Sequence, residues 1–156
     1  MSSTCHLTNI IPSNEHIMLL YSSDYERNNA AVNYINSGLK SGYQCIYASI
    51  NANDSKSSSN ISNLSTKIDN YKENIGSGEL QIVVNFKPYY ESAVHGDLSP
   101  FNKLKVELKK TSTSSEIWRK KDVILAFADA ACFLSKNKHL AECEVLEKRW
   151  YNTTTE

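Results

Sequence analysis

The stretch from Glu15 to Ile50 constrains the fold of this chain more than any other part of the sequence. It contains an apolar run at residues 17–21, a helical stretch that begins near Ser23, and a second β-rich run at residues 44–49. The connection between the two runs is long enough to hold a helix and too long for a hairpin. The two strands are therefore expected to lie parallel, with the helix crossing over them.

The helix of this unit has start, face and stop signals. Ser23 and Glu26 have the spacing of a capping box, in which each side chain accepts a hydrogen bond from a free backbone N–H of the first turn. Apolar residues follow at the spacing of one buried helix face: Ala30, Ala31, Tyr34, Ile35 and Leu39. Gly42 is expected to end the helix, because glycine adopts the left-handed conformation without strain.

The rest of the chain repeats this alternation. A polar loop is predicted at residues 51–59. A single helix, stopped by Gly76, is predicted from regularly spaced apolar residues: Ile61, Leu64, Ile68, Tyr71 and Ile75. Further strands are predicted at residues 80–86 and 123–127, both rich in apolar side chains.

Loops and helices connect and follow these strands. We expect a polar loop at residues 91–97, a short helix with Ser99 as its cap and Pro100 as its first residue, and a helical stretch after residue 129. The last helix is predicted at residues 138–150. Its buried face should contain Leu140, Cys143, Leu146 and Trp150.

The predicted elements form one α/β domain. Four strands that alternate with helices are typical of a three-layer fold with a mostly parallel sheet and flanking helices, as in Rossmann-like proteins. Residues 1–14 are expected to form a flexible N-terminal arm, residues 15–151 the domain, and residues 152–156 a frayed tail.

A ligand site is expected where the strands end, since ligands of such sheets bind outside the carboxyl ends of the strands. The candidates for its lining are His16, Tyr21, Tyr47, Tyr89, Tyr90 and Asp129. His16 and Tyr21 lie at opposite ends of one predicted strand, so they cannot both contact one small ligand. For Tyr89 and Tyr90, packing against the rim of the sheet is the alternative role. For Asp129 the alternative is to cap the next helix.

Common catalytic and cofactor motifs are missing from the sequence. The segment Tyr21 to Asn28 contains no glycine or lysine, so it forms neither an ATPase phosphate loop nor a dinucleotide-binding turn. No Gly-x-Ser-x-Gly or His-Glu-x-x-His pattern occurs, and the cysteines match no zinc or redox spacing. We therefore expect a protein that is not an enzyme and holds no metal or cofactor. An enzyme that uses Asp129 with a nearby tyrosine is an alternative.

Charge and hydropathy indicate the partners and the location. The chain carries 17 basic and 17 acidic residues, whereas direct nucleic-acid binding usually requires a clustered basic excess. Direct nucleic-acid binding is therefore not expected. No apolar run approaches the ~18 residues of a membrane span, and the first residues lack the pattern of a secretory leader. We expect a cytoplasmic protein without a membrane partner.

Three short motifs resemble those of one known family. They are His16-Ile-Met-Leu-Leu-Tyr21, then Gly38-Leu-x-x-Gly42 before Cys45-Ile-Tyr47, and Glu142-x-Glu144-x-x-Glu147-x-x-Trp150. Over residues 15–151 the chain resembles the MEDS domain (methanogen/methylotroph, DcmR sensory domain). The resemblance implies a fold related to RecA and KaiC-type ATPases without their phosphate loop. It also implies a sensory module of signal transduction or transcription regulation, with small hydrocarbon-derived compounds as proposed signals. His16 corresponds to the characteristic N-terminal histidine of the family.

The expected function follows from both lines of reasoning. We expect a non-catalytic sensory domain of degenerate RecA-like fold that binds an unidentified small molecule at the strand ends. The sequence shows no helix-turn-helix or kinase domain, so a signal is expected to pass through a homodimer or a regulatory protein partner. The alternative is a RecA-like scaffold that acts as a protein interaction or oligomerisation module.

Overall fold

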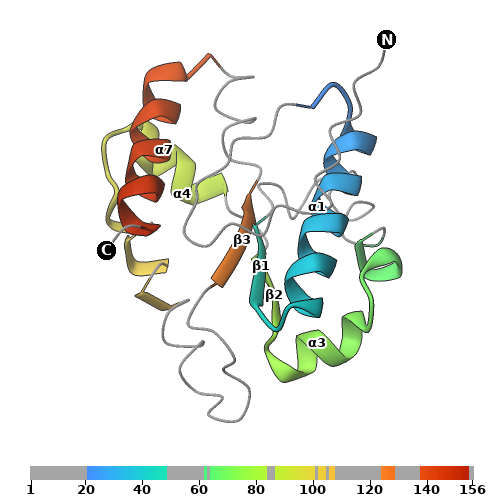
Figure 1. Ribbon diagram of the computed structural model, residues 1–156. Coiled ribbons are helices and arrows are strands. Elements are labelled where there is room, and N and C mark those ends of the chain that lie inside the picture. Colours follow the sequence, from blue (N-terminus) through green and yellow to red (C-terminus); the bar gives the residue numbers. More distant parts are fainter. Residues whose placement is uncertain are drawn as a thin grey trace.

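Figure 1 shows the computed structural model of the chain. It describes residues 21–48, 62, 64–83, 87–100, 102–104, 106–107, 124–128 and 138–154. The described elements follow one another as α1 (Asp24–Lys40), β1 (Gln44–Ala48), α3 (Tyr71–Ser77), β2 (Leu80–Val83), α4 (Lys87–Val94), β3 (Ile124–Ala128) and α7 (Leu140–Thr154). Helices and strands alternate along the chain, which has an α/β fold.

The described strands form an open parallel sheet in the order β2-β1-β3. β1 lies in the middle, where Cys45 is paired with Leu80 of β2 and with Leu125 of β3. The parallel direction that the long connections predict is confirmed. All three strands lie within or next to the ranges predicted from the sequence, and the predictions for residues 49, 84–86 and 123 lie outside the described residues. Of the strand predicted at residues 17–21, only Tyr21 is described, and it is not part of a strand.

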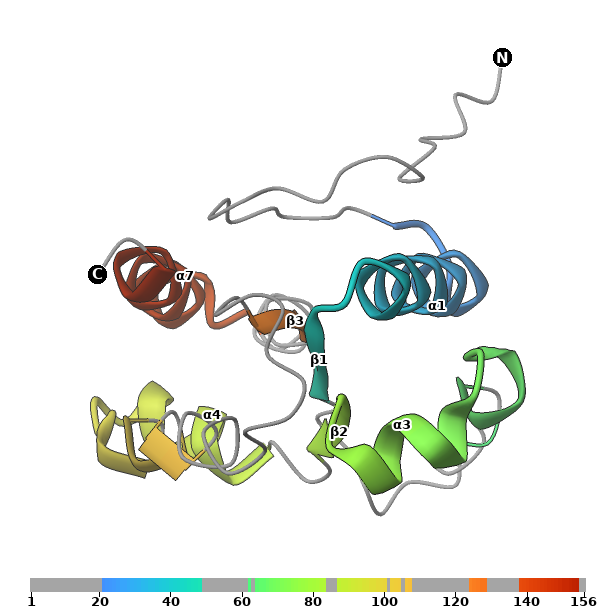
Figure 2. The same ribbon diagram turned by 60° about the horizontal axis from the view of Figure 1, so that its bottom comes forward.

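Helices lie on both sides of this sheet. Figure 2 shows α1 and α3 on one side and α4 and α7 on the other. On the α1 side, Tyr47 of β1 belongs to a buried cluster with Ile35. On the other side, Ala48 packs in a smaller cluster with Ala93 of α4 and Leu146 of α7. Because successive side chains of a strand point to opposite faces, Tyr47 and Ala48 contribute to different clusters.

α1 begins as the capping box predicts, with one difference. The hydroxyl oxygen of Ser23 accepts a hydrogen bond from the backbone N–H of Glu26 at 3.2 Å. The Glu26 carboxylate, however, accepts from the backbone N–H and the hydroxyl of Ser22, at 2.9 and 2.7 Å. The reciprocal bond therefore goes to the residue before the cap. Gly42 follows the helix with a φ of 76°, in the left-handed region, as expected.

The last turns of α1 lie close against the sheet at Gly38. A Cβ atom on this residue would lie 2.6 Å from Sγ of Cys45 and 2.8 Å from Cδ1 of Leu125. Both distances are shorter than the Cβ contacts that occur in proteins. The packing of helix on strands at this position therefore requires glycine, a role that the helix pattern alone does not reveal.

The single helix predicted over residues 61–75 is wrong, because the helix is interrupted. The backbone is helical at residues 64–67, leaves the helix at residues 68–70, and becomes helical again in α3 at Tyr71. Asn70 has φ 51° and ψ 38°, which is the left-handed conformation. The two helical parts therefore do not share one axis.

The apolar face predicted for this helix is retained only in its first part. Leu64 and Ile68 are buried, whereas Ile75 is 39% exposed. Gly76 does not stop the helix but lies inside α3, where an added Cβ atom would meet no other part of the protein within 4 Å. α3 ends at Gly78, which has a φ of 79°.

The second half of the chain contains more helix than predicted. Residues 87–94 form α4, so the loop predicted at residues 91–97 is wrong for its first half. α7 extends to Thr154, past the boundary predicted at residue 151. Leu140 was predicted on its buried face but is 65% exposed. The short helix predicted after a cap at Ser99 is confirmed at residues 99–100, 102–104 and 106–107, but Ser99 is itself helical and the carbonyl of Leu98 accepts from the backbone N–H of Asn102. The predictions for residues 1–14, 51–59 and 130–134 lie outside the described residues.

Candidate functional site

The strands end together at one edge of the sheet. Ala48 at the end of β1 is paired with Val83 of β2 and with Ala128 of β3. From β1 the chain continues to β2 on one side, and from β2 it crosses back to β3 on the other side of β1. The position between β1 and β3 is therefore a topological switch point, where ligands of open parallel sheets bind. This edge is the candidate site.

α1 begins at the same edge. It ends at Lys40, shortly before β1 starts at Gln44, and the two elements contact each other, so they run in opposite directions. In Figure 1 the β3 arrow points toward the end of the molecule at which α1 begins. The start of a helix carries free N–H groups and a partial positive charge. The first turn of α1 therefore adds polar groups to the edge where the strands end.

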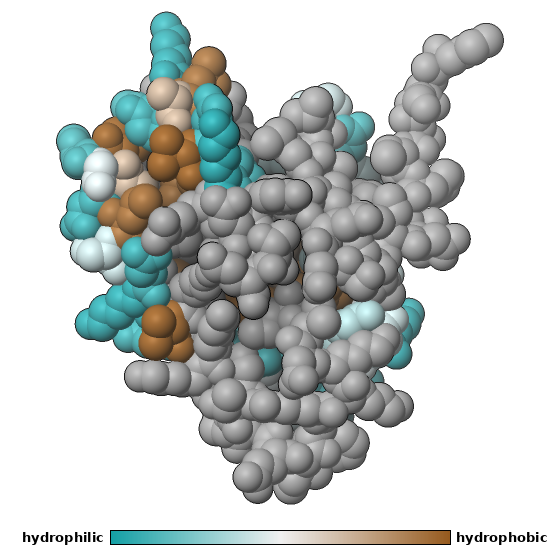
Figure 3. Space-filling model, turned by 60° about the vertical axis from the view of Figure 1, so that its left-hand side comes forward, coloured by the Kyte–Doolittle hydropathy of each residue, from teal (hydrophilic) through white to brown (hydrophobic). Residues whose placement is uncertain are grey.

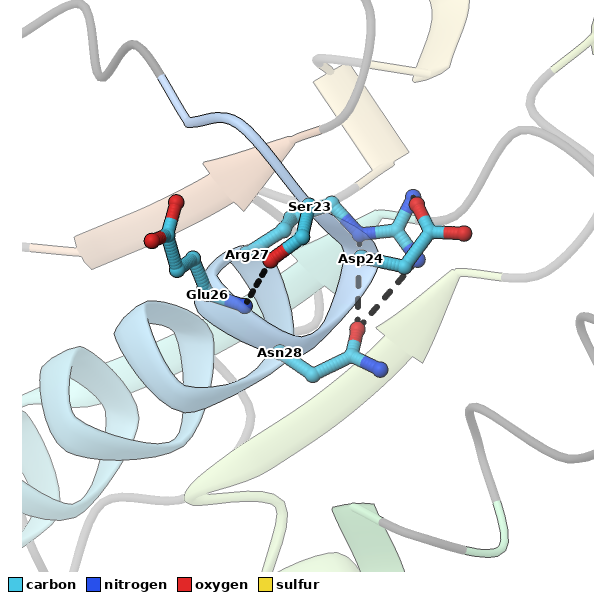
Figure 4. A network of polar contacts seen from close by, with 5 residues as sticks. All are labelled: Ser23, Asp24, Glu26, Arg27 and Asn28. Carbon is cyan, nitrogen blue, oxygen red and sulfur yellow. Dashed lines mark hydrogen bonds and ion pairs between the residues drawn. The ribbon is translucent and has the colours of Figure 1, made fainter.

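A polar network surrounds Arg27 in this first turn (Figure 4). The guanidinium lies 3.5 Å from the Asp24 carboxylate, and two of its nitrogens donate to the side-chain carbonyl of Asn28 at 3.3 and 3.2 Å. The Arg27 side chain is only 11% exposed, whereas the Asp24 side chain is 63% exposed. A largely buried guanidinium held in one orientation is suited to bind a carboxylate or a similar planar anion.

Arg27 is a functional candidate that the sequence reasoning missed. The signal available in the sequence is an arginine in the first turn of a helix that follows a predicted strand. That signal does not show that the guanidinium is buried, because burial depends on tertiary contacts that the local sequence does not specify.

Acidic side chains share this turn with Arg27. Hydrogen bonds from the hydroxyl and the backbone N–H of Ser22 hold the pKa of Glu26 below its usual value of 4.5. Glu26 is therefore ionised at neutral pH, and Asp24 adds a second carboxylate to the turn. Their charge opposes the binding of a polyphosphate, although Arg27 attracts anions.

Tyr47 lies in the core below the edge. Its side chain is 1% exposed, and its ring stacks on Phe127 of β3 with the centroids 6.0 Å apart and the planes at 14°. Tyr34 of α1 packs against the same Phe127 ring at 6.3 Å, and burial raises the pKa of Tyr34 to about 12. Tyr47 therefore packs in the structure as described, and direct contact with a ligand would require the core to open.

The two tyrosines that follow β2 lie in a helix, not at a strand end. Tyr89 and Tyr90 are both part of α4. Tyr89 is half-buried and packs against the cluster that contains Ala48 and Leu146. Tyr47 belongs to the cluster on the opposite side of the sheet. The structure therefore does not bring Tyr47 and Tyr89 together in one site.

The remaining predicted lining residues are only partly described. Tyr21 is half-buried immediately before α1, and its hydroxyl oxygen is buried. His16 and Asp129 lie outside the described residues, so their place in the site stays a prediction. Among the predicted lining residues that the structure describes, Tyr21 is the one next to the first turn of α1.

The described cysteines have the environment of packing residues. Burial, together with the charge of Glu79, raises the pKa of the Cys45 thiol to about 12. Burial also raises the pKa of Cys143. Both thiols therefore stay protonated at neutral pH and react slowly. In the described part of the chain, no group of three or more His, Cys, Asp or Glu side chains is arranged to hold a metal ion.

Comparison of the chain with models of known protein families, with curated proteins and with solved structures found no match. The resemblance to the MEDS domain therefore stays a prediction based on the motifs quoted above. Within the described ranges, no helix is long and apolar enough to cross a membrane.

Proposed function

We propose that the chain is a non-catalytic sensory domain that binds a small molecule at the carboxyl ends of its strands. The observation that carries this proposal is the switch point between Ala48 of β1 and Ala128 of β3. The Arg27 guanidinium at the start of α1 adds a group that can recognise a ligand at the same edge. The motifs shared with the MEDS domain support the sensory role.

The proposal includes a three-layer, degenerate RecA-like fold. Its support is the parallel sheet with helices on both sides, together with a first turn of α1 that lacks the glycine and lysine of a phosphate loop. A chain of this kind keeps the edge at which nucleotides bind and uses it for another ligand.

The proposed ligand is a small organic molecule with one anionic group. Arg27 provides the positive charge, and its planar guanidinium suits a carboxylate. A nucleotide fits less well, because Asp24 and Glu26 repel several negative charges at once.

Native mass spectrometry of the freshly purified chain, compared with the same sample after denaturation, tests this function. We expect a stoichiometric additional mass that disappears on denaturation. The Arg27→Ala variant should lose this mass, whereas Lys72→Ala, which removes a positive charge from the exposed face of α3, should retain it. A wild-type chain that carries no small molecule and assembles as a dimer or larger would contradict the sensory function. Retention of the ligand by Arg27→Ala would remove Arg27 from the site.

A second function, as an interaction or oligomerisation module, is favoured by a different observation. Two apolar side chains of α7 are exposed, Leu140 by 65% and Val145 by 53%, and Val106 is 50% exposed. Figure 3 shows hydrophobic residues gathered among hydrophilic ones on the side of the molecule that carries α4 and α7. Light scattering of Val145→Lys at several concentrations tests this alternative. Assembly that the wild-type chain shows and the variant lacks would support it.

A further inference from the structure

Side chains from the end of α1 and the start of β1 hold the interrupted helix in place. The residues involved are spaced four apart in the sequence: Asn36, Lys40 and Gln44. All three bind the segment from residue 67 to residue 78. We refer to these three side chains as the clasp.

Asn36 replaces two hydrogen bonds of a continuous helix. Its Nδ2 donates to the carbonyl oxygen of Lys67 at 3.2 Å, and its Oδ1 accepts from the backbone N–H of Asp69 at 3.0 Å. In an uninterrupted α-helix the Lys67 carbonyl would accept from the N–H of Tyr71, and the Asp69 N–H would donate to the carbonyl of Ser65. The Asn36 amide therefore satisfies one acceptor and one donor that the interruption leaves without helical partners.

Lys40 and Gln44 bind near the two ends of α3. The Lys40 ammonium lies 3.1 Å from the Asp69 carboxylate, before the helix begins. Nε2 of Gln44 donates to the carbonyl oxygen of Gly78, which ends the helix, at 3.1 Å. The segments at both ends of α3 therefore contact side chains that lie far away in the sequence.

The local sequence favours a different arrangement of this segment. The apolar spacing from Ile61 to Ile75 fits one continuous helix. The interruption places Asn70 in the left-handed conformation, which is costly for residues with a Cβ atom and least costly for Asn and Asp. Local preference and the clasp thus oppose each other.

We propose that residues 64–77 form a two-state element, a broken helix while the clasp is closed and a continuous helix when it opens. The inference does not depend on the identity of the ligand. It supplies what a sensory domain requires, because a ligand reports its presence only by shifting an equilibrium between two arrangements.

Two double variants of the full chain test this proposal by opposing substitutions at Asn70. Both double variants carry Asn36→Ala, which removes the hydrogen bonds of Asn36 to Lys67 and Asp69. Asn70→Ala then disfavours the left-handed conformation, whereas Asn70→Gly permits it without strain. Asn33→Ala, at an exposed asparagine one turn earlier in α1, is the matched control.

NMR backbone shifts and the three-bond HN–Hα coupling of residue 70 report the sign of its φ. We expect a positive φ in the wild type, in Asn33→Ala and in Asn36→Ala/Asn70→Gly. We expect helical shifts through residues 67–71 in Asn36→Ala/Asn70→Ala. Each net hydrogen bond is worth roughly threefold to tenfold in an equilibrium constant, so Asn36→Ala should raise the population of the continuous helix about 10- to 100-fold.

Hydrogen exchange provides the second measurement. The Asp69 amide should exchange about 3- to 10-fold faster in Asn36→Ala/Asn70→Gly than in Asn33→Ala, because its one acceptor, Oδ1 of Asn36, is gone. The proposal would be overturned if both double variants keep a positive φ at residue 70 and their Asp69 amides exchange as slowly as in Asn33→Ala. The interruption would then be imposed by the buried side chains of Leu64 and Ile68.

Discussion

The contact between α1 and the sheet at Gly38 makes a prediction that a matched pair of variants can test. In Gly38→Ala the new methyl group would meet Sγ of Cys45 at 2.6 Å and Cδ1 of Leu125 at 2.8 Å. In Gly76→Ala the new methyl group of α3 would meet no atom within 4 Å. Both glycines lie close to the C-terminal end of a helix, so the substitutions differ mainly in packing.

The expected magnitudes follow from two opposing terms. Replacing glycine by alanine in a helix stabilises it by about 0.5–1 kcal/mol, and both variants gain this amount. Overpacking a buried position costs about 1–3 kcal/mol, and only Gly38→Ala has this cost. The free energy of unfolding of Gly38→Ala should therefore be about 1–3 kcal/mol below that of Gly76→Ala.

Urea unfolding followed by circular dichroism measures this difference. For a chain of this length, each kcal/mol lost from the free energy of unfolding lowers the melting temperature by about 2–4 °C. Adding Cys45→Ala should reduce the cost of Gly38→Ala, because the sulfur atom closest to the new methyl group is removed. If Gly38→Ala is as stable as Gly76→Ala, the reasoning about close packing is refuted.

Three further predictions concern the helix start, a buried thiol and the smaller core. Ser22→Ala removes the hydroxyl hydrogen bond that contributes most to lowering the pKa of Glu26, and it leaves the bond from the backbone N–H of residue 22 in place. The stabilisation from this lowered pKa is present above pH 4.5 and is lost as the pH falls through the folded-state value. The variant should therefore lose stability at pH 7 and show a weaker acid dependence in urea unfolding at pH 2–7. Burial raises the pKa of Cys45 to about 12, so this thiol should react slowly with iodoacetamide. Peptide mapping should find Cys45 unmodified in the folded chain and alkylated in urea. Alkylation at equal rates in the two conditions would contradict its burial. Leu146→Ala should lower the free energy of unfolding by about 2–5 kcal/mol, because this side chain is 1% exposed. Val145→Ala, at the next position but 53% exposed, should change it by about 0.5 kcal/mol or less, and equal effects would contradict the assignment of Leu146 to the core.

The helix and the second strand of the predicted strand–helix–strand unit could be predicted because their signals are local. The cap at Ser23, the stop at Gly42 and the strand from Gln44 are all confirmed. The parallel direction also followed from the sequence, since the length of a connection limits how two strands pair. The candidate edge at the strand ends follows from this direction and not from any motif.

The interrupted helix could not be predicted, because its cause lies elsewhere in the chain. Asn36 binds backbone groups more than thirty residues away, and a periodic pattern carries no information about such a contact. The loop predicted at residues 91–97 failed for a similar reason. Tyr89 and Ala93 are held in α4 by packing on the cluster of Ala48 and Leu146, which outweighs the polar composition of the segment.

The sequence by itself determined the class of the fold, because helix caps, glycine stops and apolar strands act over a few residues. Only the tertiary structure decided the order β2-β1-β3, and with it the switch point between Ala48 and Ala128. It also decided that Tyr47 packs in the core while Arg27 lies at the edge with a largely buried side chain. The physical reason is that burial and strand order depend on contacts between distant segments, which form only when the whole chain packs.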